Sequence, residues 1–170
     1  MMFLLVVSGF VLSIVAPFIY LKYKRVAPFL LALYPLILFI YFLTQITAVG
    51  LGPVTESYQW VPLLGINFSF YLDGLSLVFS LLISGIGFLV LIYASEYMKK
   101  DLYAHKFYLF FLLFMSSMLG LVLSSNLVVM FVFWELTSIS SFFLIGHKHK
   151  STKARKSALQ ALLITAGGGL

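Results

Sequence analysis

The sequence has no cysteine and very few charged residues. Of its 170 residues, 9% are charged and only five are acidic, whereas an ordinary soluble domain is about one-quarter charged. The absence of cysteine excludes disulfides, thiolate metal sites and cysteine-bound iron–sulfur clusters. The scarcity of charge excludes a typical soluble domain.

Common enzyme signatures are also missing. The sequence has no nucleophile-plus-base arrangement, glycine-rich phosphate loop or metal motif. The glycine run at 167–169 follows a helical segment instead of a strand, so it is not a dinucleotide fingerprint. His105, His147 and His149 lie outside the predicted helices, which argues against an axial haem pair. We predict no catalytic residue, cofactor or metal in this chain, and leave open whether it serves a redox-driven translocase.

Apolar residues, by contrast, are abundant. The chain is 62% hydrophobic with a mean hydropathy of +1.10, and a bilayer-spanning helix needs about 20 apolar residues. A sixth apolar run begins at residue 158, but only 13 residues remain in it, too few to cross. We therefore predict an all-α membrane protein, a polytopic helix bundle with one membrane domain over residues 1–170. Five complete transmembrane helices are expected, before the start of a sixth, at residues 2–21, 26–49, 73–97, 107–124 and 127–146.

The segment 50–72 differs from the helical runs. From Ile66 to Leu72, apolar and polar residues alternate with period two, which is a strand pattern. Tyr58 and Trp60 form a weaker version upstream, and residues 62–65 supply a turn. Aromatic residues suit a membrane–water interface. We predict a short β-hairpin at the outer surface.

The basic residues are confined to alternate loops. The loops near residues 50–72 and 124–126 contain no lysine or arginine. By the positive-inside rule the basic loops are cytoplasmic, and the N-terminus lies outside a plasma membrane. The charge therefore indicates topology and contact with membrane lipids, not nucleic acid. The basic loops hold Lys22, Lys24 and Arg25; Lys99, Lys100 and Lys106; and Lys148, Lys150, Lys153, Arg155 and Lys156.

Glu135 is the strongest candidate for a functional residue. It lies nine residues into its predicted helix, about 13 Å along the axis, and therefore near the middle of the bilayer. An ionisable residue there is costly and indicates an ion or proton pathway. Ser138 lies one turn further on, close to the same face. The alternative is a structural hydrogen bond between helices.

A stripe of polar and small residues follows the hairpin. Asp73, Ser76, Ser80, Ser84 and Gly87 recur at three- or four-residue spacing, which places them close to one helical face. Together with Ser138, they form a possible polar lining of an ion path. Alternatively, Asp73 satisfies the helix dipole, and the small residues allow close helix packing.

The order of several motifs resembles the antiporter-like family. This family includes the large subunits of Mrp-type sodium/proton antiporters and the chain 5-type subunit of respiratory NADH:quinone oxidoreductase, and the Trp-Glu-Leu-Thr-Ser form is most similar to the Mrp A-type subunit. The resemblance covers residues 58–170. It is carried by Tyr71-Leu72-Asp73-Gly74-Leu75-Ser76, Tyr93-Ala94-Ser95-Glu96-Tyr97-Met98, Ser125-Asn126-Leu127, Phe133-Trp134-Glu135-Leu136-Thr137-Ser138 and Leu144-Ile145-Gly146.

The resemblance implies a function and a set of partners. It makes Glu135 a proton-pathway residue that is partnered by a lysine on a later helix, so we expect this chain to be an N-terminal fragment or one piece of a split subunit. The first hypothesis is sodium/proton antiport with the other subunits of an Mrp-type complex. The second is proton pumping within a redox-driven respiratory or hydrogenase complex. The third is an assembly subunit without an ion path.

Overall fold

The computed structural model describes residues 1–61, 66–148 and 151–169. These residues form seven helices and one antiparallel two-stranded sheet. The elements are α1 (Met2–Lys22), α2 (Ala27–Thr44), α3 (Ile46–Leu51), β1 (Val54–Val61), β2 (Ile66–Leu72), α4 (Gly74–Tyr97), α5 (Ala104–Leu123), α6 (Leu127–Ile145) and α7 (Thr152–Gly169).

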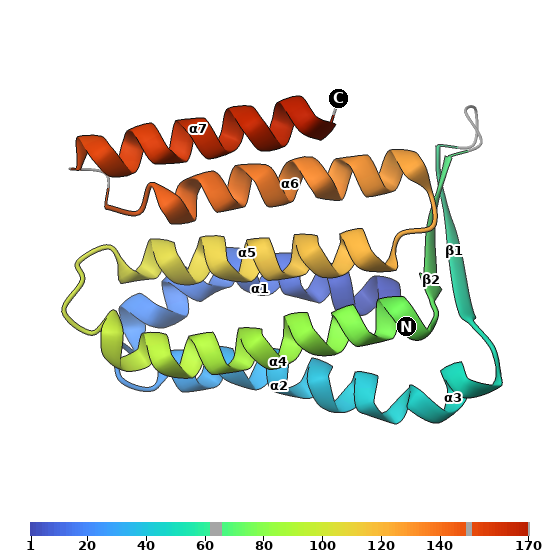
Figure 1. The fold of residues 1–170 in the computed structure, drawn as a ribbon. Helices are drawn as coiled ribbons and strands as arrows, with labels where there is room; N and C mark the ends of the chain where they lie inside the picture. The colour runs from blue at the N-terminus through green and yellow to red at the C-terminus, as the bar shows by residue number, and fades with distance from the viewer. Residues whose placement is uncertain (62–65, 149–150, 170) are drawn as a thin grey trace.

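The long helices lie side by side, and the β-hairpin stands across one end of them (Figure 1). The loops that join α1 to α2, α4 to α5 and α6 to α7 all lie at the opposite end. These loops hold or adjoin the basic residues, so positive charge gathers at one end of the bundle. Among the described residues, five helical segments are long and apolar enough to cross a membrane, with α2 and α3 counted together. The predicted fold class is confirmed.

Several helices that pack against each other in the bundle are far apart in the sequence. Helix α5 packs mainly against α1 and α6, whereas α2 packs against α4. Gly9 permits α1 to lie close to α5 and α2, because a Cβ there would lie 2.1 Å from Ser116 Oγ and 2.5 Å from the Tyr34 hydroxyl. That hydroxyl donates to the Leu5 carbonyl at 2.6 Å. Tyr34 therefore joins α1, α2 and α5 at this level of the bundle.

The predicted hairpin is confirmed, and it is attached to the helices at several points. Strand β2 leads directly into α4, whose N-cap residue is Asp73. On its other edge, the Ser69 carbonyl accepts a hydrogen bond from the Ser125 N–H at 2.9 Å, and Phe70 forms a bridge with Ser124. The tight turn between α5 and α6 therefore continues the sheet. The turn predicted at residues 62–65 lies outside the described residues.

Glu56 of β1 attaches the hairpin to the start of α1. Its carboxylate accepts hydrogen bonds from the Met1 terminal ammonium and from the Phe3 N–H, at 3.4 Å for the latter. A carboxylate at a helix N-terminus also interacts favourably with the helix dipole. Partial burial opposes ionisation, but the bonds from the ammonium and from the Met2 and Phe3 N–H groups outweigh it, and the pKa of Glu56 is lowered.

We expect Glu56→Gln to destabilise the chain by roughly 1 kcal/mol at neutral pH. Because the pKa of Glu56 is lowered in the folded state, its stabilisation is present above the ordinary pKa and is lost as pH falls through the lowered value. Thermal unfolding at pH 7 and pH 3 measures this, and the gap between variant and wild type should be smaller at pH 3. Glu96→Gln is the control, because Glu96 only pairs at 3.2 Å with Lys99 on the exposed surface. A gap that is equal at both pH values would contradict the assignment.

The helix predicted at residues 26–49 is interrupted at Gln45. The Thr44 hydroxyl donates to the Tyr41 carbonyl at 2.7 Å, and the Gln45 N–H bonds to the Phe42 carbonyl at 3.1 Å instead. The same kind of bond, from the Thr137 hydroxyl to the Trp134 carbonyl at 2.7 Å, leaves α6 continuous, so it does not by itself explain the interruption. The prediction of one continuous helix was wrong at Gln45.

Two other predicted boundaries were also wrong. Helix α5 begins at Ala104 instead of residue 107, and α7 begins at Thr152 instead of residue 158. Lys153, Arg155 and Lys156 therefore belong to the first turns of α7 and not to a loop. Lysine and arginine are good helix formers, and their charged ends reach water from a helix that begins near the surface.

Candidate functional site

Glu135 lies at the centre of α6, as the ninth of its 19 residues. The helix begins sharply, because the Asn126 side chain accepts hydrogen bonds from the Val128 and Val129 N–H groups at 2.9 and 3.3 Å. After this cap the helix is apolar on all sides until Glu135, and it is long enough to span the membrane. The carboxylate is therefore placed near mid-membrane.

Glu135 and Phe133 leave α6 in different directions. The α5–α6 contact is made by Phe133, whose ring would lie 2.5 Å from a Cβ at Gly120, and by Phe143, which stacks on Phe110 at 4.3 Å. At about 100° per residue, Glu135 leaves the helix about 160° away from Phe133. Glu135 therefore lies opposite Phe133, whereas Phe143 lies only about 80° from it by the same rule.

The carboxylate of Glu135 is partly buried and incompletely bonded. Its Oε1 atom is buried and has no hydrogen-bond partner among the residues that the structure describes. Leaving an ionised carboxylate without a partner in an apolar medium costs several kcal/mol or more, so the group must be protonated, paired or hydrated. Ser138, one turn away, is buried and donates to the Trp134 carbonyl at 3.2 Å instead.

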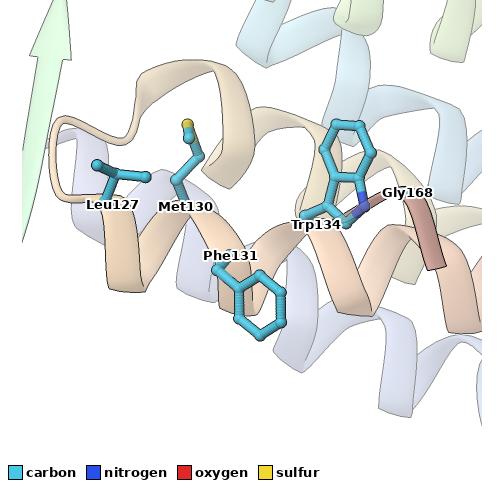
Figure 2. A pocket seen from close by; sticks show the side chains of 5 residues that line it. All are labelled: Leu127, Met130, Phe131, Trp134 and Gly168. Atoms are coloured by element: carbon cyan, nitrogen blue, oxygen red, sulfur yellow. The ribbon is translucent and has the colours of Figure 1, made fainter. Parts of the chain in front are cut away.

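Trp134 connects the Glu135 helix to α7. Its indole N–H donates to the Thr165 carbonyl at 3.2 Å. Figure 2 shows its ring beside Gly168, with Leu127, Met130 and Phe131 further along α6. These residues line a cavity of 220 Å³ between the two helices. The sequence did not predict this contact, because it joins residues 31 positions apart.

Asp73 acts as a helix cap in the structure. Its side chain accepts from the Ser76 N–H at 2.8 Å, and the Ser76 hydroxyl accepts from the Asp73 N–H at 2.8 Å, which completes a capping box. The hydrogen bonds from the Ser76 N–H and hydroxyl hold the pKa of Asp73 below its ordinary value. In the structure Asp73 and Ser76 therefore cap the helix, which was the alternative to a polar lining. Their part in an ion path stays a prediction.

The remaining serines of the stripe lie inside the bundle. Ser80 and Ser84 are fully buried. The Ser84 hydroxyl donates to the Ser80 carbonyl at 2.6 Å, whereas the Ser80 hydroxyl has no partner among the described residues. Gly87 on the same face approaches Met115, because a Cβ there would lie 2.7 Å from its sulfur. The structure does not bring this stripe to Glu135, since α5 lies between α4 and α6 (Figure 1).

A histidine–aspartate pair at the basic end was missed by the sequence analysis. His147 Nε2 lies 3.1 Å from Asp101 Oδ2, which links the loop after α6 to the loop before α5. Partial burial opposes the charge on Asp101, but bonds from the Tyr103 N–H and His147 lower its pKa. His105 lies in the first turn of α5, and His149 lies outside the described residues. No cluster of three or more metal-binding side chains occurs within residues 1–61, 66–148 and 151–169.

Two family models match separate parts of this chain. Residues 60–108 match the model described as NADH-ubiquinone oxidoreductase (complex I), chain 5 N-terminus. Residues 124–170 match the model described as NADH:quinone oxidoreductase/Mrp antiporter, TM. The chain belongs to this antiporter family. Asp73, Ser80 and Ser84 fall within the first match, and Glu135 falls within the second.

Curated members of the family are similar over nearly the whole chain. The chain is 47% identical over 167 residues to the A-type subunit of the Na(+)/H(+) antiporter of Alkalihalophilus pseudofirmus, covering 96% of this chain and 21% of that protein. It is 43% identical over 168 residues to the corresponding A1-type subunit of Staphylococcus haemolyticus, covering 97% and 21%. The chain thus spans about a fifth of the length of these relatives.

Solved structures of the family share the fold. A chain in the structure of the Mrp complex from Dietzia sp. DQ12-45-1b superposes with a TM-score of 0.88 at 34% identity, over 99% of this chain and 18% of that one. A chain of the membrane-bound sulfane sulfur reductase, an archaeal respiratory membrane complex, superposes with a TM-score of 0.83 at 20% identity, over 99% and 34%. The second likeness concerns the fold alone.

Proposed function

We propose that this chain is part of a proton/cation-translocating membrane subunit that carries out sodium/proton antiport in an Mrp-type complex. The observation that carries the proposal is Glu135, a carboxylate at the middle of a membrane-spanning helix with a buried, unbonded Oε1 among the described residues. Such a group can bind and release a proton where few other side chains can. The similarity to the A-type subunits of sodium/proton antiporters supports sodium as the exchanged cation.

The position of Glu135 on α6 supports a partner beyond the described helices. No described cation bonds its Oε1 atom, which is nevertheless buried. In this proposal Glu135 exchanges its proton with groups of the remaining subunit or of neighbouring subunits. Ser138 contributes a hydroxyl one turn away, and the buried Ser80 and Ser84 with the Asp73–Ser76 cap form a separate polar lining along α4.

Antiport is tested in everted vesicles from cells that lack their own sodium/proton antiporters and express the complex containing this chain. After respiration has acidified the vesicle interior, added sodium should dissipate the pH gradient, as followed with a pH-sensitive dye. Potassium at the same ionic strength is the control. An unchanged pH gradient after sodium addition would contradict the antiport assignment. Acidification of the lumen of vesicles that hold the purified complex, when a reductant and an electron acceptor are added without sodium, would favour redox-driven pumping.

We further propose that the basic end of this multi-pass protein is cytoplasmic and that the hairpin is outside a plasma membrane. The three loops at the basic end and the hairpin at the other end are consistent with this orientation (Figure 1). Because cytoplasmic loops carry the excess of lysine and arginine, the sign of the charge selects the orientation.

Single cysteines test the orientation. Ser57→Cys on β1 and Ser151→Cys before α7 are both exposed positions at opposite ends of the bundle. In intact cells, a membrane-impermeant maleimide should label Ser57→Cys alone, and after permeabilisation it should label both. The natural chain lacks cysteine and provides the blank. Labelling of Ser151→Cys in intact cells would reverse the assignment.

A further inference from the structure

Asp101 and His147 form a close pair that joins two loops at the basic end of the bundle. Their side chains are only 28% and 11% exposed, and the imidazole Nε2 lies 3.1 Å from the carboxylate Oδ2. The other carboxylate oxygen accepts a hydrogen bond from the Tyr103 N–H at 2.7 Å. The ring of Phe107 meets the imidazole ring edge-on, with 6.1 Å between their centres. Both partners are therefore held in place, unlike the members of a fluctuating surface pair.

His147 is the member of this cluster that changes charge near neutral pH, because histidine ordinarily titrates between pH 5 and pH 8. Partial burial opposes the charge on Asp101, but the bonds from a backbone N–H and from the imidazole lower its pKa, so it stays ionised in this range. Lys148, which acts on Asp101 from the same loop as His147, keeps its positive charge. The nearby phenols of Tyr20 and Tyr103 carry no charge in this range.

The loop that carries His147 leads into α7 and contacts it. Gly146 precedes the imidazole, and a Cβ there would lie 3.5 Å from the Cβ of Ala158, a fully buried residue of α7. The Ser151 N–H, directly before α7 begins, bonds at 2.9 Å to the carbonyl of the residue after His147. Among the described residues, α7 packs mainly against α6. The pair therefore links the beginning of α7 to the α4–α5 loop.

We propose that Asp101 and His147 form a proton-operated clasp between the α4–α5 loop and the beginning of α7. A protonated imidazole donates a charge-assisted hydrogen bond to the carboxylate, and such bonds are about twice as strong as neutral ones. A neutral imidazole donates from Nε2 in only one tautomer, and in the other it turns a lone pair toward the carboxylate. The clasp is therefore tightest when His147 is protonated, and it loosens as pH rises through the titration of the imidazole.

The clasp acts on one end of α7 only. The other end is held by the hydrogen bond from the Trp134 indole N–H to the Thr165 carbonyl at 3.2 Å. Opening the clasp therefore frees the beginning of the helix while its far end stays attached to α6. This inference rests on the contacts at the basic end and does not depend on the proton-carrying role of Glu135.

Site-directed spin labelling of the full chain tests the clasp. His105→Gln and His149→Gln leave His147 as the only histidine, and the natural chain has no cysteine. A nitroxide on Ser151→Cys, an exposed position before α7, is measured in lipid nanodiscs by electron paramagnetic resonance. Its mobile fraction should increase severalfold from pH 5 to pH 8, because His147 loses its proton in this range.

Variants of the pair separate the clasp from other effects of pH. Asp101→Asn keeps the size of the side chain and an oxygen for the Tyr103 N–H, but it removes the charge, so the label should be mobile at both pH values. Asp101→Glu keeps the charge and should retain part of the pH response. The matched control is a nitroxide on Ser57→Cys in β1, at the opposite end of the bundle (Figure 1), which should show no pH response. A response at Ser151→Cys that survives Asp101→Asn, no response with the natural pair, or an equal response at Ser57→Cys would overturn the proposal.

Discussion

Glu135→Gln should leave the complex assembled and lower its sodium-driven proton exchange by at least about tenfold. Glutamine keeps the shape of the side chain and much of its hydrogen bonding, but it cannot titrate. If Glu135 only joined helices, the amide would serve nearly as well. If it carries a proton, exchange requires the proton to come and go, and the variant has no means of doing this.

Two further variants sharpen this expectation. Glu135→Asp titrates but is shorter by one methylene, so it should retain part of the exchange. Ser138→Ala removes the neighbouring hydroxyl, which already bonds to the Trp134 carbonyl, and should have a much smaller effect. The measurement is dye-reported exchange in everted vesicles, normalised to the amount of assembled complex. Undiminished exchange by a normally assembled Glu135→Gln complex would leave only the packing role.

The second large effect is expected at Gly9. A side chain at this position would overlap Ser116 Oγ and the Tyr34 hydroxyl, at 2.1 and 2.5 Å from the Cβ. Overpacking of this kind typically costs about 1–3 kcal/mol or more, because backbone must move. Gly9→Leu should therefore separate α1 from α5 and lower the unfolding temperature by about 5 °C or more, as followed by thermal unfolding in detergent.

The controls for Gly9 come from the same chain. Gly50→Ala in α3 adds a Cβ with no atom within 4 Å and should be nearly neutral. Gly9→Ala should be destabilising, and adding Ser116→Ala and Tyr34→Phe removes both overlapping oxygens and should restore part of the stability. If Gly9→Ala is as stable as the natural chain, α1 and α5 do not approach as closely as the structure indicates.

The local part of the fold was predictable from the sequence, because it depends on periodicity and charge. The apolar runs gave the membrane helices, and the period-two alternation before Asp73 gave β2. The interruption at Gln45 was not predictable from hydropathy, since apolar residues continue on both sides of it. The start of α7 was misplaced because its first turns are basic, and charge was taken as a sign of a loop.

The candidate site was predictable only in part, for a similar reason. The depth of Glu135 follows from its position along one helix, which sequence alone supplies. The face on which it lies relative to α5, the Trp134–Thr165 bond and the Asp101–His147 pair all depend on how separate helices pack. The capping box between Asp73 and Ser76, by contrast, is a local contact, so the spacing of these two residues alone could have predicted it.

The pairing of α1 with α5 has a consequence for the order of assembly during synthesis. Helix α1 emerges before the other described helices, but its main packing partner begins at Ala104, and the turn that receives β2 lies later still. Until α5 has entered the bilayer, the small-residue face around Gly9 is in contact with lipid. The weak contact between α1 and α2 leaves α1 without its main partner through this interval, so the bundle closes only when the fourth long helical segment, α5, arrives and the hairpin joins the α5–α6 turn.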